Sequence, residues 1–104
     1  MKRLVLLFCA VLPLRAQSPA PALTSAREVR ALSAEQAAEK KPVRLRATVN
    51  AIDPGRSIFI QDATGGTFIN RKPAAWSVAT GDVVEVEGVT YPGLFLPGVS
   101  ASDV

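Results

Sequence analysis

Hydrophobic and polar residues alternate along the second half of the chain. From Val43 onwards the apolar side chains occupy every second position, namely Val43, Leu45, Ala47, Val49 and Ala51. The positions between them are polar, namely Arg44, Arg46, Thr48 and Asn50. A period of two is typical of a β-strand with one face in the core and one in water. The pattern therefore predicts a half-buried strand.

Further short segments of the same kind follow, separated by turn residues such as those of Asp53–Arg56 (DPGR). These segments are residues 57–62, 67–70, 83–90 and 94–99. We expect Ile58 and Ile60 to point inward from residues 57–62, and Val84 and Val86 from residues 83–90. Repeated short strands joined by Gly/Pro turns predict a mainly β fold, a small antiparallel five-stranded barrel over residues 43–104. The fifth strand would still be pairing where the sequence ends, so an incomplete barrel with an open edge is also possible from the sequence.

Two short helices are predicted ahead of the strands. Residues 25–28 (SARE) and 33–36 (SAEQ) both have the form of a capping box. The first helix would place Val29 and Leu32 on its apolar side, and the second would run from 34 to 40 and end before Pro42. Neither is long enough to be stable alone, so each is expected to dock on the barrel.

The N-terminal segment is predicted to be a signal peptide covering residues 1–16. Met1–Arg3 is positively charged, and the eleven apolar residues that follow, Leu4–Leu14, are too few to span a membrane as a helix. A Pro/Ala-rich linker and the two helices would then occupy residues 17–42. This order predicts a periplasmic or secreted protein. A lipid anchor at Cys9 and a buried helix of a cytosolic domain are the less favoured alternatives.

Charge and composition exclude several chemistries. The net charge of +3 includes Lys2, Arg3 and Arg15 of the leader, without which nine Lys and Arg stand against nine Asp and Glu. A net attraction to nucleic acid is therefore not expected. The chain has no histidine, and its one cysteine lies in the leader. We expect no catalytic constellation, no metal site and no cofactor, and we interpret the aspartates at 53, 62 and 82 as turn residues rather than calcium ligands.

Three stretches carry a resemblance to a known fold family: residues 43–49 (VRLRATV), 58–66 (IFIQDATGG) and 81–88 (GDVVEVEG). Together they resemble the oligonucleotide/oligosaccharide-binding (OB) barrel. The short helical lead-in at 23–33 makes the chain similar, more narrowly, to an extracytoplasmic module near the N-terminus of bacterial sensor histidine kinases and related signalling proteins. The resemblance implies a truncated copy of such a module, with membrane attachment and the kinase in a segment beyond Val104.

Four residues are the candidates for ligand binding: Phe59, Gln61, Arg44 and Arg46. Phe59 and Gln61 are expected on the outer face of the second strand, where an aromatic ring can stack on a base or sugar. The favoured alternative for Phe59 is cover by the N-terminal helices through Val29 and Leu32. For the two arginines we favour cross-strand ion pairs over a phosphate-binding stripe, because the first strand of an OB barrel neighbours the fourth, which carries Glu85 and Glu87.

The remaining aromatic residues, Phe68, Trp76 and Tyr91, are predicted to lie in the core or to plug the barrel ends. The function that follows is a non-catalytic binding or sensory module for a small ligand or a protein partner. An exported domain that binds oligosaccharide or nucleic acid is the first alternative. A structural spacer without a ligand is the second.

Overall fold

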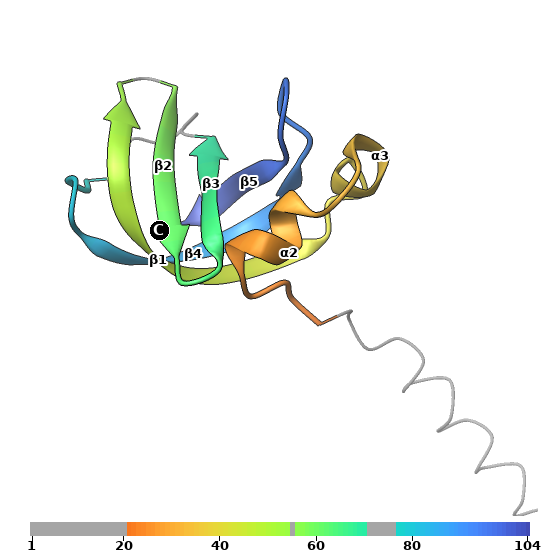
Figure 1. The fold of residues 1–104 in the computed structure, drawn as a ribbon, viewed down its shortest axis with the longest axis horizontal. Helices are drawn as coiled ribbons and strands as arrows, with labels where there is room; N and C mark the ends of the chain where they lie inside the picture. The colour runs from red at the N-terminus through yellow and green to blue at the C-terminus, as the bar shows by residue number, and fades with distance from the viewer. Residues whose placement is uncertain (1–20, 55, 71–76) are drawn as a thin grey trace, which may run out of the picture.

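A computed structural model of the chain describes residues 21–54, 56–70 and 77–104. The predicted leader, the first part of the linker and Trp76 lie outside the described residues. The strands are β1 (Pro42–Asp53), β2 (Ser57–Asp62), β3 (Gly65–Asn70), β4 (Val83–Tyr91) and β5 (Gly98–Asp103). They form a closed barrel in the order β1-β2-β3-β5-β4 (Figure 1). The predicted mainly β, five-stranded barrel is confirmed, and it closes.

One pair of strands departs from the predicted antiparallel arrangement. β3 and β5 run parallel and are paired at two positions, Ile69 with Val99 and Asn70 with Ser100. The other four pairs of neighbouring strands are antiparallel. The barrel therefore contains both parallel and antiparallel pairs. β5 lies between β3 and β4, parallel to β3 and antiparallel to β4.

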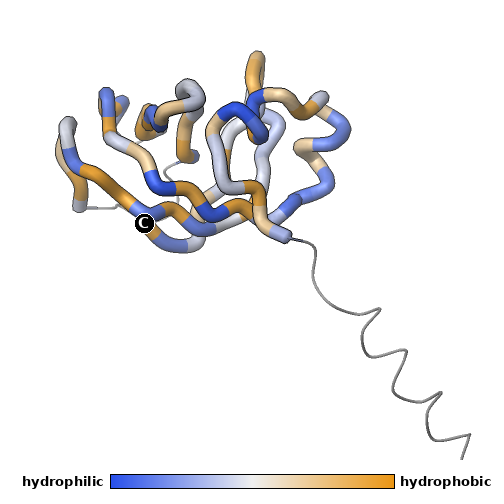
Figure 2. Tube along the Cα trace, turned by 60° about the horizontal axis from the view of Figure 1, so that its bottom comes forward, coloured by the Kyte–Doolittle hydropathy of each residue, from blue (hydrophilic) through white to orange (hydrophobic). Residues whose placement is uncertain are grey.

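The inward side chains of all five strands form one core. Leu45, Val49, Ile58, Ile60 and Val86 are at most 1% exposed, which confirms the alternation predicted for β1, β2 and β4. Figure 2 shows this alternation as a change between hydrophobic and hydrophilic residues along the strands. Burial of these apolar side chains supplies the main driving force for folding in a domain of this length.

A β-bulge changes the side of the strand on which Ala51 lies. Val49 pairs with Ile60 and Ala51 pairs with Phe59, so Asn50 is the extra residue on β1. After a bulge the alternation of sides restarts one residue later. Ala51 is therefore exposed, and the prediction that it shares the inner face with Val49 is wrong; Ile52 takes the next inward position.

The fifth strand lies later in the sequence than predicted. Residues 94–99 were expected to form it, but β5 begins at Gly98 and pairs with β4 as far as Asp103. Residues 92–97 instead form the loop between β4 and β5. Gly88 allows the close approach of the two strands, because a Cβ at this position would overlap the carbonyl oxygen of Ser100.

Both predicted helices are present, as α2 (Ala26–Arg30) and α3 (Ala34–Ala37), and both have the predicted capping boxes. α3 ends at Ala37 rather than at residue 40, because the chain turns at Lys40, whose φ is 55°. Thr90 of β4 fixes this end of α3: its hydroxyl donates to the carbonyl oxygen of Ala37 (2.7 Å) and accepts from the backbone N–H of Lys41 (2.9 Å).

α2 packs against β3 and β5, at the place where these two strands are joined by few hydrogen bonds (Figure 1). Val29 is completely buried and belongs to the barrel core. Leu23, just before the helix, makes an isolated parallel bridge to Val43 of β1. The predicted docking of the first helix is confirmed, and its role is to close the gap between β3 and β5.

Candidate functional site

Five of the six exposed large apolar side chains of the described residues gather on one side of the barrel together with the half-buried Phe68, and the sixth, Val83, lies outside this group. We call this surface the apolar face; its residues are Phe59, Phe68, Tyr91, Leu94, Phe95 and Leu96. They line a groove of about 440 Å³ between the outer surface of β2 and β3 and the loop from β4 to β5. Asp53, Arg56, Ser57 and Asn70 add a polar border.

Strand register brings the aromatic rings of this face together. Phe59 of β2 pairs with Phe68 of β3 on the outer surface. The ring of Phe68 meets the ring of Tyr91 edge to face, with centroids 6.2 Å apart and an interplanar angle of 85°. Aromatic pairs of this geometry contribute about 0.5–1.5 kcal/mol to stability beyond the contribution of their buried area. The prediction that Phe68 and Tyr91 lie in the core or plug a barrel end is wrong; both line the groove.

A glycine makes room for Phe68. A Cβ at Gly98 would lie 2.6 Å from the Phe68 ring, well inside van der Waals contact. Gly98 is itself buried, so the ring covers its backbone. The absence of a side chain at position 98 therefore lets the ring of Phe68 pack closely on the start of β5.

The loop between β4 and β5 carries the most exposed apolar side chains. Leu94 and Phe95 are 93% and 92% exposed, and Leu96 is 47% exposed. A Pro-Gly pair stands on each side of these three residues, and Gly93 has a φ of 65°, a conformation that side chains other than glycine rarely adopt. Figure 2 shows the loop as a hydrophobic tip that projects from the barrel.

Phe59 is not covered in the way the sequence suggested. Its side chain is 44% exposed, and α2 packs on β3 and β5 instead. Val29 is directed into the core rather than over Phe59. The expectation that Val29 and Leu32 of the helices cover Phe59 is therefore wrong, and the partly exposed Phe59 lines the groove.

Gln61, the second candidate on β2, points outward like Phe59 but borders a different hollow. Its side-chain oxygen accepts a hydrogen bond of 2.8 Å from the amide of Asn50, the bulged residue of β1. The pair borders a separate hollow with Thr48, Asp62 and Ala63. The structure thus separates Gln61 from the groove that contains Phe59.

Arg44 and Arg46 lie on the outer surface of β1, opposite Glu87 and Glu85 of β4. The guanidinium of Arg44 forms an ion pair with the carboxylate of Glu87 at 2.7 Å. The predicted cross-strand placement of opposite charges is confirmed. Of the two described arginine–glutamate pairs, only Arg44 and Glu87 form an ion pair; Arg46 and Glu85 face each other across the strands without one. Neither arginine lines the groove.

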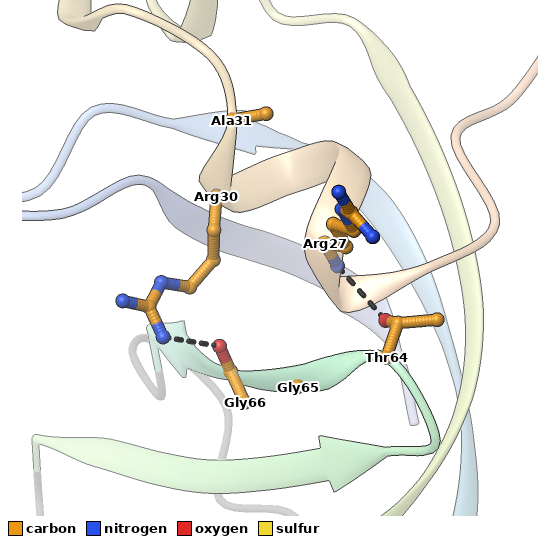
Figure 3. A pocket seen from close by; sticks show the side chains of 6 residues that line it. All are labelled: Arg27, Arg30, Ala31, Thr64, Gly65 and Gly66. Atoms are coloured by element: carbon orange, nitrogen blue, oxygen red, sulfur yellow. Dashed lines mark hydrogen bonds between the residues drawn. The ribbon is translucent and has the colours of Figure 1, made fainter.

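A second hollow, of about 350 Å³, lies between α2 and the turn from β2 to β3 (Figure 3). Arg30 donates to the carbonyl oxygen of Gly66 at 3.1 Å, and the backbone N–H of Arg27 donates to the Thr64 hydroxyl at 3.0 Å. In Figure 3 the two guanidinium groups extend in different directions from the helix. We interpret this hollow as the joint that attaches α2 to the barrel.

The carboxylate of Asp62 also attaches α2 to the barrel. One carboxylate oxygen accepts from the backbone N–H of Ala26 at 2.8 Å, and the other from the N–H groups of Thr64 (2.8 Å) and Gly65 (3.2 Å). Partial burial raises the pKa of Asp62, but the hydrogen bonds from Thr64, Ala26 and Gly65 outweigh it and leave the pKa below its ordinary value. The turn role predicted for this aspartate is confirmed.

Glu28 shows the same effect at the start of α2. Hydrogen bonds from the backbone of Thr24 and from Ser25 lower the pKa of this exposed carboxyl. The ionised form is favoured, as expected for a capping-box glutamate near the positive end of a helix. The side chain of Glu28 thus serves to cap the N-terminus of α2.

Within residues 21–54, 56–70 and 77–104, no group of three or more Cys, Asp or Glu side chains is placed to hold a metal ion. In the same part of the chain, none of the helices has the length and apolar character needed to cross a bilayer. No protein-family model matches the chain, and no curated protein matches it significantly in sequence.

Most of the apolar face was not predicted from the sequence, although the residues that flank Leu94–Leu96 indicate a loop there. The tripeptide Leu94–Leu96 stands between two Pro-Gly pairs, and such flanks are typical of a loop rather than a strand. An apolar segment that cannot continue as a strand has to be either buried or exposed as a contact surface.

Proposed function

We propose that this chain is an exported, non-catalytic binding module that contacts its partner through the apolar face. The observation that carries this proposal is the contiguous exposure of Phe59, Tyr91 and Leu94–Leu96 around one groove. Large apolar patches of this kind mark interaction sites on soluble proteins, whereas scattered exposed apolar residues do not. The groove is formed by rigid strands on one side and by a loop on the other, the usual arrangement for a recognition surface.

The chemistry of the groove supports binding rather than catalysis. Its described border contains one carboxylate, Asp53, and one guanidinium, Arg56, and the chain provides no histidine to act as a general base. The aromatic and aliphatic side chains offer contact area and shape. A partner would therefore be recognised by apolar and aromatic groups, with a polar contact at one end.

A second candidate function rests on the exposed rings. Phe59 and Phe68 could stack on the rings of an oligosaccharide or of nucleotide bases. Nucleic acid is the less favoured ligand of the two, because Arg44 is paired with Glu87 and the groove itself is bordered by a single arginine and an aspartate.

We further propose that the module acts outside the cytoplasm as the N-terminal part of a sensor histidine kinase-type membrane protein. The charged start and apolar stretch of residues 1–14 support export, and the resemblance of residues 23–104 to an extracytoplasmic OB-like module supports the signalling role. The test of export is a fusion of residues 1–40 to a phosphatase that is active only outside the cytoplasm. Activity supports the proposal. A phosphatase that is expressed but inactive refutes it.

Binding through the apolar face is tested by calorimetric or thermal-shift titrations with cell-wall oligosaccharides, single-stranded oligonucleotides and small aromatic solutes. Replacing Phe59 by Ala should weaken binding of any ligand that stacks in the groove by about 5- to 100-fold. Replacing Arg44 by Ala should leave it unchanged. Loss of binding in the Arg44 variant, with the Phe59 variant unaffected, would place the ligand on the other surface.

A further inference from the structure

The apolar face combines a hollow and a projection. The groove between β2, β3 and the loop is concave, whereas Leu94 and Phe95 stand at the tip of the loop with 93% and 92% of their surface exposed. A small molecule seated in the groove would leave these two side chains in water. Only a macromolecular surface can cover both features.

The charges at the border of the groove balance each other. Asp53 and Arg56 lie at the polar border of the groove, three residues apart in the turn between β1 and β2. The neighbouring hollow, which Phe59, Phe68 and Leu96 also line, adds Arg30. Two arginines and one aspartate still offer little attraction to anionic lipid headgroups, which need larger clusters of basic residues. The two charges of the groove border are self-complementary: a two-fold axis can bring Arg56 of one copy near Asp53 of the other.

The exposed apolar area is close to what one half of an interface requires. The exposed fractions of Phe59 (44%), Tyr91 (37%), Leu94 (93%), Phe95 (92%) and Leu96 (47%), at roughly 150–250 Å² for a large side chain, correspond to roughly 600 Å² per copy. A standard interface buries about 800 Å² on each partner, including its polar rim. With the border residues added, two such faces match this size.

We propose that a second copy of this chain covers the apolar face, so that the module forms a two-fold symmetric dimer. The loop tip of each copy packs against the groove of the other, and Phe95 supplies the central apolar contact. The balance of nine basic and nine acidic residues outside the leader leaves little net repulsion between copies. This inference rests on the proposed function, because it names the partner for the same face.

The test is the mass of the chain in solution, measured by sedimentation equilibrium from about 1 to about 200 µM. The protein is expressed as residues 1–104 and purified in whatever processed form the host produces. We expect a reversible monomer–dimer equilibrium. Phe95→Asp should weaken dimerisation by about 10- to 100-fold or more. Val83→Asp is the matched control, since Val83 is 59% exposed on β4 and does not line the groove; it should dimerise as the unmodified chain does.

Far-UV circular dichroism of each variant establishes that the barrel is retained. A second pair of variants, Arg56→Asp and Asp53→Arg, provides a test that does not depend on one substitution. Each should dimerise poorly alone, and the equimolar mixture should form a mixed dimer. A folded Phe95→Asp variant that dimerises as the unmodified chain does would overturn the proposal.

A chain that stays monomeric over this concentration range would also overturn the dimer. If this monomer binds vesicles of zwitterionic or anionic lipid through Phe95, the surface that covers the tip is a membrane. If it binds a ligand in the groove, with Phe59→Ala weakened, the dimer is wrong and the proposed binding function stands. A monomer that binds neither contradicts both.

Discussion

Asp62, at the end of β2, accepts a hydrogen bond of 2.8 Å from the backbone N–H of Ala26, the first residue of α2. The two residues are 36 positions apart in the sequence. The same carboxylate holds the turn between β2 and β3, so one side chain fixes both the turn and the helix that closes the gap between β3 and β5. Val29 of the same helix is completely buried in the core.

Replacing Asp62 by Ala should reduce the free energy of unfolding by about 1–3 kcal/mol, because the N–H groups of Ala26, Thr64 and Gly65 lose their acceptor. Urea denaturation followed by circular dichroism measures this change. Asp103→Ala, at an exposed position of β5, serves as the control and should stay within about 0.5 kcal/mol of the unmodified protein. A loss at Asp62 no larger than at Asp103 would contradict the joint described above.

The contribution of Asp62 should depend on pH in a defined direction. Hydrogen bonds keep its pKa in the folded chain below the ordinary value of 3.8. Stability from the ionised form is then fully present above this pH and is lost as the pH falls through the folded-state pKa. The difference in unfolding free energy between the unmodified chain and Asp62→Asn should be constant near neutral pH and should narrow in acid. A difference that widens below about pH 3.8 would have the wrong sign.

Replacing Gly98 by Ala should disturb the apolar face from beneath. The new Cβ would lie 2.6 Å from the ring of Phe68, so the ring has to shift and its edge-to-face contact with Tyr91 is disturbed. We expect a changed near-UV circular dichroism spectrum and a loss of about 1–3 kcal/mol in stability. Gly66→Ala is the control, because its Cβ would meet the carbonyl oxygen of Ile60 at 3.3 Å and needs a smaller adjustment. Equal effects of the two substitutions would contradict the packing of Phe68 on Gly98.

The ion pair between Arg44 and Glu87 should contribute little to the free energy of unfolding. Both side chains are substantially exposed, so a double-mutant cycle with Arg44→Ala and Glu87→Ala should give a coupling energy of about 0.2–1 kcal/mol that falls as salt is added. Thermal or urea unfolding at low and high ionic strength provides the measurement. A coupling above about 2 kcal/mol would mean that the β1–β4 surface is more protected from solvent than the structure shows.

Local patterns predicted the regular parts of the barrel well. The alternation of Leu45, Ile58 and Val86 with polar residues reports directly on which side of a strand is buried, and the capping boxes at Ser25 and Ser33 are complete within four residues. Such information is local. The bulge at Asn50 was not visible because it depends on the register with β2, which a single strand does not encode.

The apolar face was harder to predict because its parts come from distant segments. The sequence predicts that Phe59 points outward, but it predicts that Phe68 and Tyr91 lie in the core or plug the barrel ends. Their position outside the core follows from the glycine at 98 and from the strand register, and both need the folded structure. Hydrophobicity indicates that a side chain needs cover, but it does not identify what covers it.

The central claim is that two copies of the chain contact each other through the apolar face and not through the charged surface of β1 and β4. Backbone amide NMR spectra of the labelled chain, recorded from about 10 µM to about 500 µM, test it most directly. The account predicts concentration-dependent shifts at Phe59, Phe68, Tyr91 and residues 94–96, with Arg44 and Glu87 unchanged. Shifts centred on Arg44 and Glu87, or none anywhere, would contradict it.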